Sequence, residues 1–369
     1  TFTTGTQTLT GNSAFAGTML MNGGTLILDS GALTNAALLD IDNGEIRLVN
    51  GGAVNQLAND VVVDLADDVD ALLNLNNFDE QIGELLGGGG TGGNVDLGSG
   101  RLVISDGNGN TYSGIIGVGG DSGALELNAG NQTLAGDSEY TGETQIDGGA
   151  LILGAAASLD SLSFDINAGE LRLGGPNQLD NAAVVDLANN AAALFNLNGN
   201  TETIGQLTGG GAAGGNTQLG AGALTIADGN GNTYGGVISG TGSVTLVTGT
   251  QTLGADNTFT GGLNIQNGAT VVVADDDFLA GDTSAINLDG GTVQFSANDT
   301  WTAGTRAITV NAVGGGAISG TFDTDGNDVT INAVIADGAA AGSVIKTGTG
   351  ALTLGADRKS TRLNSSHYS

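Results

Sequence analysis

The chain has 369 residues, a formal net charge of -31 at pH 7, 68 glycines and one proline. This acidity disfavours nucleic acids and anionic membrane surfaces as partners, because both are bound through basic residues. The scarcity of proline excludes collagen, and an apolar content of 39%, arranged in short alternating runs, argues against a disordered chain.

The N-terminal segment, residues 1–25, lacks the basic and apolar regions of a signal peptide. No apolar run in the chain approaches the roughly 18 residues of a membrane-spanning helix. We therefore expect the targeting and anchoring segments of a secreted protein to lie outside this sequence. The chain has no cysteine, so burial and backbone hydrogen bonds must stabilise the fold without disulfides.

A Gly-x-Gln-Thr-Leu phrase begins at Gly5 and returns at Gly130 and Gly249. Each copy is followed by an aromatic-x-Gly step and by a glycine-containing turn that leads into three apolar residues. The spacing predicts repeat units of about 120 residues. We divide the chain into repeat 1 (1–129), repeat 2 (130–248), repeat 3 (249–346) and the start of a fourth (347–357).

Short runs of alternating apolar and polar residues fill each repeat and end in Asn-Gly, Asp-Gly or Gly-Gly. Residues 102–104 precede Asp106-Gly107 in this way, and residues 224–226 precede Asp228-Gly229. Alternation predicts strands, and these dipeptides predict tight turns. Because no linker separates the repeats, we expect one all-β solenoid, a parallel β-helix, rather than a row of sandwiches.

Repeat 1 and repeat 2 share a Glu-x-Arg pair, formed by Glu45 with Arg47 and by Glu170 with Arg172. A carbohydrate-cleaving β-helix would use carboxylates together with a basic residue, but an active site normally occurs once in a chain. We therefore interpret the duplicated pair as a surface ion pair across a strand.

A second duplicated motif alternates oxygen-bearing side chains, as the start of a calcium loop does. The calcium candidates are Asp106, Asn108, Asn110, Asp228, Asn230 and Asn232. The expected loop glycine and the bidentate glutamate are both missing, and turn chemistry explains the same residues. The acidic runs 275–277 and 323–328 are interpreted in the same two ways, as solvated corners or as ion sites.

Residues 120–123, Gly-Asp-Ser-Gly, resemble the nucleophile motif of chymotrypsin-like proteases. A serine nucleophile needs a base, and the chain has a single histidine, His367, near its end. We expect no catalytic residues and no cofactor. A carbohydrate-active protein is the alternative, but Trp301, Tyr112, Tyr234 and Phe195 are scattered along the sequence and form no predicted sugar platform.

Residues 358–369 break the repeat pattern and contain 3 of the 8 basic residues together with His367. They look like a translated sequencing-adapter read-through, and we interpret them as a non-native tail.

Residues 348–357, Gly-Thr-Gly-Ala-Leu-Thr-Leu-Gly-Ala-Asp, and residues 253–268 resemble the autotransporter-associated β-strand repeat. The resemblance implies a right-handed parallel β-helix in a passenger on a Gram-negative cell surface, anchored by an outer-membrane barrel outside this sequence. It implies a structural or adhesive stalk without enzymatic activity. The expected partners are host or environmental glycans or surface proteins, and the stalk is expected to be monomeric.

Overall fold

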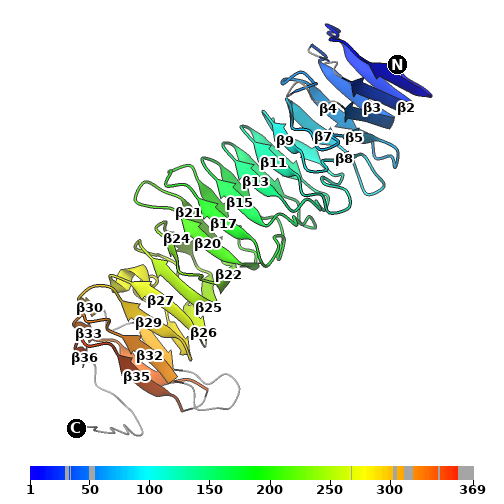
Figure 1. Ribbon diagram of the computed structural model, residues 1–369. Helices are drawn as coiled ribbons and strands as arrows, with labels where there is room; N and C mark the ends of the chain where they lie inside the picture. Colours follow the sequence, from blue (N-terminus) through cyan, green and yellow to red (C-terminus); the bar gives the residue numbers. More distant parts are fainter. Residues whose placement is uncertain are drawn as a thin grey trace. The chain divides into compact units, whose positions relative to one another are not determined.

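The computed structural model describes residues 1–29, 33, 35–49, 55–266, 268–301, 306–310, 319–339 and 341–355. The chain divides into two compact units, Thr1–Gln218 and Leu219–Ser369, which we name the N-terminal and C-terminal units. In each unit, successive strands pair in parallel and stack as coils of a solenoid (Figure 1). The all-β parallel solenoid expected from the sequence is thereby confirmed. The predicted tail, 358–369, lies outside the described residues.

The longer sheet of the N-terminal unit begins at the first strand of the chain. Its strands are β1 (Thr6–Leu9), β2 (Thr18–Asp29), β3 (Leu38–Val49), β4 (Val62–Leu65), β5 (Leu72–Asn74), β7 (Glu84–Gly87), β8 (Asn94–Asp96), β10 (Asn110–Tyr112), β12 (Asn131–Leu134), β14 (Ala150–Leu153), β16 (Glu170–Arg172), β18 (Leu194–Asn196) and β21 (Asn216–Gly220). The long β3 pairs with β2 on one side and with both β4 and β5 on the other, so the sheet branches there.

A second ladder runs along another face of the N-terminal unit. Its strands are β6 (Glu80–Ile82), β9 (Arg101–Ile104), β11 (Ala124–Leu127), β13 (Glu143–Ile146), β15 (Ser163–Ile166), β17 (Val184–Leu187) and β20 (Gln206–Gly209), and the short β19 (Glu202–Ile204) precedes β20. The pairing has no register slips, so equivalent side chains lie above one another from coil to coil.

The core follows from this register. Alternate side chains of a strand point to opposite faces, so one residue in two enters the interior of the coil. One interior column contains Leu102, Leu125, Thr144, Phe164, Val185 and Leu207. Each of these side chains is buried. Burial of one such leucine or valine stabilises the fold by about 1.5–3 kcal/mol, which explains how a narrow core suffices.

The C-terminal unit has three ladders. The first contains β22 (Ala223–Asp228), β25 (Ser243–Leu253), β26 (Leu263–Gln266), β28 (Ile286–Asp289), β31 (Ala307–Val310) and β34 (Val334–Asp337). The second contains β23 (Asn232–Tyr234), the end of β25, β27 (Ala269–Val273), β29 (Thr292–Phe295), β32 (Ser319–Asp323) and β35 (Ser343–Thr347). The third contains β30 (Asp299–Trp301), β33 (Val329–Ile331) and β36 (Leu352–Leu354), and β24 (Ile238–Gly240) lies before β25.

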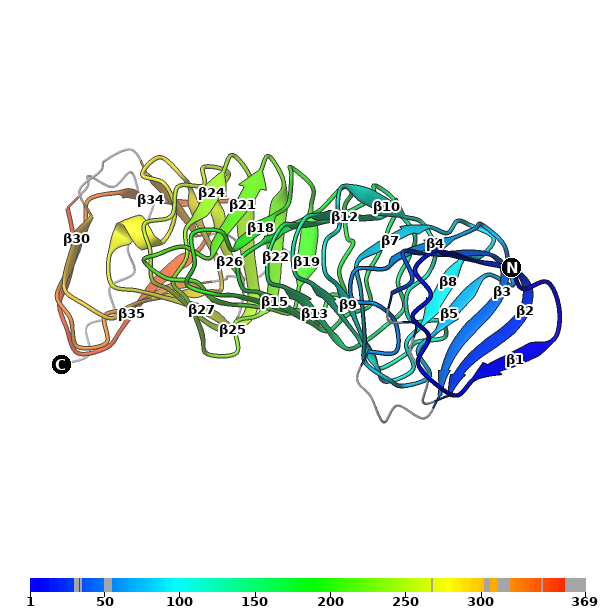
Figure 2. The same cartoon turned by 90° about the horizontal axis from the view of Figure 1, so that it is seen from above.

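One short 3-10 helix, η1 (Asp276–Phe278), follows β27 and is the yellow coil in Figure 2. Asp275 caps it, because its carboxylate accepts a hydrogen bond from the backbone N–H of Asp277 at 3.1 Å. The helix replaces the turn that ends most strands, and it puts three consecutive aspartates at one corner of the coil.

Glycine at the repeated corners is a steric requirement. Gly149 has a φ of +70°, and a Cβ at this position would lie 1.6 Å from the carbonyl oxygen of Gly130 in the preceding coil. Gly24 has a φ of +80° and would place a Cβ 2.3 Å from the oxygen of Gly5. Neither corner can therefore carry a side chain, which explains why the glycine-containing phrase recurs.

Candidate functional site

The outer face of the second ladder carries a line of three carboxylates and one amide in the N-terminal unit. Glu126, Gln145, Asp165 and Asp186 follow one another in register on β11, β13, β15 and β17. We call these four residues the outer column. Strand spacing in a ladder is about 4.8 Å, so Asp165 and Asp186 are neighbours of like charge.

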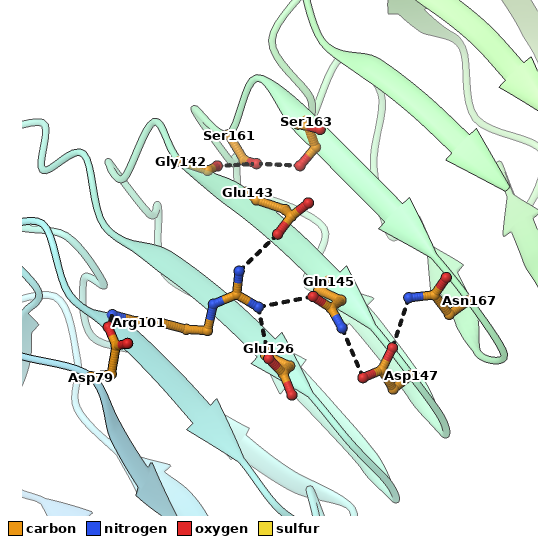
Figure 3. A network of polar contacts seen from close by, with 10 residues as sticks. All are labelled: Asp79, Arg101, Glu126, Gly142, Glu143, Gln145, Asp147, Ser161, Ser163 and Asn167. Carbon is orange, nitrogen blue, oxygen red and sulfur yellow. Dashed lines mark hydrogen bonds and ion pairs between the residues drawn. The ribbon is translucent and has the colours of Figure 1, made fainter. Parts of the chain in front are cut away.

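Arg101 on β9 neutralises one end of this face (Figure 3). Its guanidinium donates to Glu126 at 2.7 Å, to Gln145 at 2.8 Å and to Glu143 at 2.9 Å. Asp147 continues the network, because it accepts from Gln145 at 2.8 Å and from Asn167 at 2.8 Å. One guanidinium thus joins three consecutive coils through three acceptor side chains.

The far end of the outer column has no such neutralisation among the described residues. Burial raises the pKa of Asp165, and the charges of Asp186, Glu143 and Asp147 raise it further, while the Asn167 amide opposes them. Burial also raises the pKa of Asp186. The column is therefore a surface of concentrated negative charge, suited to basic side chains and unsuited to polyanions.

The duplicated Glu-x-Arg pair forms an ion pair in both copies, as the sequence predicts. Arg47 Nε lies 2.7 Å from Glu45, and Arg172 Nη2 lies 2.6 Å from Glu170. Burial opposes ionisation of Glu170, but hydrogen bonds from Arg172 and Asn196 hold its pKa below the usual value. Each pair lies along one strand, with more than 40% of the arginine side chain exposed, and it contributes about 1 kcal/mol or less.

The first set of calcium candidates lies in a tight turn before β10. Asp106 accepts from the backbone N–H of Asn108 at 2.9 Å, and Asn108 has a φ of +48°. The side-chain amides of Asn108 and Asn110 donate to Glu84 at 3.0 Å and 2.7 Å. The amide nitrogens are thus engaged by a carboxylate, and Asp106 Oδ1 is engaged by the turn.

The second set of calcium candidates repeats the turn before β23. Asp228 accepts from the backbone N–H of Asn230 at 2.9 Å, and Asn230 also has a φ of +48°. Asn232 begins β23. Calcium at either turn stays a prediction, and the geometry gives these residues a structural use of their own.

Sequence reasoning missed two buried glutamates. Glu80 is 1% exposed and accepts from the backbone N–H groups of Gln56 at 2.7 Å and Leu57 at 3.1 Å. Glu202 is fully buried and accepts from Gln178 at 2.8 Å and Thr203 at 3.1 Å. We call them the Glu80 clamp and the Glu202 clamp, because each holds backbone of the preceding coil.

The signal for these clamps was present in the sequence. Asn-Gln-Leu occurs at 55–57 and again at 177–179, and each copy is followed at the same distance by Glu80 or Glu202. A glutamate followed by a polar residue, Gln81 or Thr203, looks like an exposed strand position. Only the fold shows that backbone N–H groups replace water around it.

The Gly-Asp-Ser-Gly motif at 120–123 forms a turn. Asp121 accepts from the backbone N–H of Leu97 at 2.9 Å, and its carbonyl oxygen accepts from Thr141 at 2.8 Å. Ser122 is exposed, and His367 lies outside the described residues. The motif is accounted for by coil-to-coil hydrogen bonds.

Aromatic side chains give no support to a sugar-stacking platform. Trp301, Tyr112, Tyr234 and Phe195 are all buried, with at most 1% exposed. Stacking on a sugar ring requires an accessible aromatic face, so these four residues serve the core. Over the described part of the chain, no helix is both long and apolar enough to cross a membrane.

Comparison with known proteins agrees with the repeat pattern. A family model described as Passenger-associated-transport-repeat matches residues 4–28, 127–153 and 248–273, and each match contains one Gly-x-Gln-Thr-Leu phrase. The chain is 31% identical over 242 residues to the Adhesin BmaC autotransporter of Brucella suis biovar 1 (strain 1330). The matched part is 61% of this chain but 6% of that protein. No solved structure matches. The resemblance to autotransporter passengers is thus confirmed: the chain carries three passenger-associated transport repeats and is similar to a segment of an autotransporter adhesin.

Proposed function

We propose that this chain is part of a secreted or surface-displayed passenger with an adhesive and structural role, and that it is not an enzyme. The observation that carries the proposal is the coincidence of three passenger repeats with a parallel solenoid similar to an adhesin segment. In agreement with it, the charged side chains considered above form hydrogen bonds within the fold. These are Arg101, Arg172, Glu80, Glu202 and Asp121.

The proposed partners are proteins on the contacted surface that present basic side chains. The net charge of -31 attracts such partners and repels polyanions. Because the same charge makes copies of the chain repel one another, we propose that it acts as a monomer. The far end of the outer column, at Asp165 and Asp186, is a part of the described surface that fits a basic partner.

Adhesion is tested with beads that carry the full chain, placed on host-cell monolayers under flow. We expect more retention than for beads that carry an unrelated protein of equal charge density. An Asp165→Asn/Asp186→Asn double variant should lose retention, and a Glu45→Gln/Arg47→Gln variant, which alters an ion pair elsewhere, should keep it. Equal retention of the chain and the charge-matched protein would refute specific adhesion.

A further inference from the structure

The corner that contains η1 gathers carboxylates from two distant segments. Asp275 and Asp276 lie at the start of η1, and Asp299 begins β30. One carboxylate oxygen from each residue lies within 4.8 Å of the other two. We call Asp275, Asp276 and Asp299 the three-aspartate site. The sequence marked 275–277 as an acidic run, and the fold adds Asp299.

One carboxylate in this site, that of Asp276, lacks the partner that burial demands. Asp276 is 7% exposed, and no hydrogen bond to its carboxylate occurs among the described residues. The Asp299 carboxylate is better supplied, because its Oδ1 accepts from the N–H of Thr300 at 2.7 Å. Burial raises the pKa of Asp299, and hydrogen bonds from the Trp301 side chain and the Asp276 backbone oppose the rise. An enclosed carboxylate oxygen without a donor costs free energy unless a cation or water binds it.

The nearby arginine does not supply that partner. Arg306 is 2% exposed, and its guanidinium donates to the carbonyl oxygens of Asp276 at 2.7 Å and Ala280 at 2.9 Å. It forms no ion pair with the three carboxylates within the described residues, although burial lowers its pKa and the charges of Asp276, Asp282, Asp277 and Asp299 oppose that effect. One guanidinium thus stands against five carboxylates, and the corner keeps an excess of negative charge.

We propose that the three-aspartate site binds a divalent cation of the calcium class. Calcium takes carboxylate oxygens at about 2.3–2.6 Å in flexible geometry, and three carboxylate oxygens within 4.8 Å of one another can all reach one such ion. Magnesium needs near-octahedral order at about 2.0–2.1 Å and gives up its water reluctantly, so a corner of three carboxylates favours calcium. The site is separate from the outer column, and the inference does not depend on the adhesive role.

The position of Trp301 makes the proposal testable. It is the chain's single tryptophan, it is 1% exposed, and it lies two residues after Asp299 on β30. Its indole is 5.6 Å from the Arg306 guanidinium. Tryptophan fluorescence therefore reports on this corner alone, and terbium bound at the site should luminesce through energy transfer from Trp301.

The experiment titrates the full chain, stripped of metal by a chelator, with calcium chloride, magnesium chloride and terbium chloride. We expect a saturable change in Trp301 fluorescence with calcium, at least tenfold weaker binding of magnesium, and sensitised terbium emission. Asp275→Asn retains the oxygen that caps η1 but removes a charge, so it should weaken calcium binding at least tenfold. Asp276→Asn and Asp299→Asn should do the same or more.

The matched controls are Asp106→Asn and Asp228→Asn, which alter the two turns first considered for calcium. They should leave the Trp301 titration unchanged, and circular dichroism in the presence of chelator checks the fold of every variant. The proposal is overturned by a chain that shows no calcium-dependent signal. It is equally overturned if Asp275→Asn, with its fold intact, binds calcium as the unaltered chain does.

Discussion

The Glu80 clamp and the Glu202 clamp are two copies of one hydrogen-bonding arrangement, and the glutamine beside each clamp has different partners. Behind the Glu202 clamp, Gln178 accepts from Gly174 at 2.8 Å and Gly175 at 2.9 Å, and it donates to two carbonyl oxygens, one of them that of Ala157. Behind the Glu80 clamp, Gln56 donates to Val49 at 3.2 Å, and its Oε1 has no partner among the described residues. Repetition of sequence therefore does not ensure equal local stability, because the neighbouring coil supplies half of each contact.

The largest effect should come from removing the glutamates themselves. Glu202→Ala leaves the buried N–H groups of Gln178 and Thr203 without acceptors, so we expect a loss of about 3–5 kcal/mol in the free energy of unfolding. Urea unfolding, with hydrogen exchange at these two amides, measures it. Glu202→Gln keeps an acceptor oxygen and should lose less, whereas a larger loss for Glu80→Ala would reverse the order we infer.

The glutamines should show the difference between the copies most directly. Gln178→Ala removes four hydrogen bonds and should lower the free energy of unfolding by about 2–3 kcal/mol. Gln56→Ala removes one hydrogen bond among the described residues, that to Val49, and should cost about 1 kcal/mol. The two variants remove the same atoms, so each serves as the control for the other in chemical denaturation. Equal costs would contradict the comparison.

The pH dependence of stability should report the charge of the Glu80 clamp. Burial raises the pKa of Glu80 from 4.5 to about 7, while backbone hydrogen bonds oppose the rise. Between these pH values the folded chain holds a proton that the unfolded chain has released, so acidification raises the free energy of unfolding. From about pH 8 to about pH 5, the unaltered chain should gain about 2 kcal/mol more than Glu80→Gln.

This difference is measured by denaturation at a series of pH values. Other carboxylates whose pKa burial raises contribute with the same sign, so the difference between the chain and its variant isolates Glu80. An equal gain in both proteins would show that Glu80 is charged in the folded state at neutral pH.

The smallest effect should come from the surface network. Arg101→Met removes the hydrogen bonds to Glu126, Glu143 and Gln145 but keeps an apolar stem against the strand. We expect a loss of about 1 kcal/mol that shrinks with added salt, as differential scanning calorimetry at two ionic strengths would show. A cost as large as that of Glu202→Ala would mean that the outer face, rather than the buried clamps, holds the coils together.

The alternation of residues such as 102–104 and the Asn-Gly and Asp-Gly turns suffice to predict parallel coils. Glycine corners also follow from sequence, since Gly149 returns where Gly24 stands. The repeat boundaries at 129, 248 and 346 stay predictions. The two compact units divide at Gln218, but this division follows the packing of the chain and does not test which segments were duplicated.

The site residues were harder to predict than the fold. Glu80 and Glu202 look like surface glutamates until the backbone of the preceding coil is placed beside them. Asp299 joins Asp275 and Asp276 only through the stacking of β30 beside η1, and no spacing rule links positions so far apart. Contacts between coils depend on the number of residues in each coil. Because the turns vary in length, this number is hard to infer from the sequence.

The register of β10, β12 and β14 has an evolutionary consequence. Tyr112 pairs with Leu134, and Leu134 pairs with Leu153, so the three strands present interchangeable edges. If one full coil were lost, β10 would pair with β14 in the same register. An inserted copy of a coil would pair with its neighbours equally well. Such a chain can change the length of its solenoid by recombination between its own repeats, while the remaining coils keep their contacts.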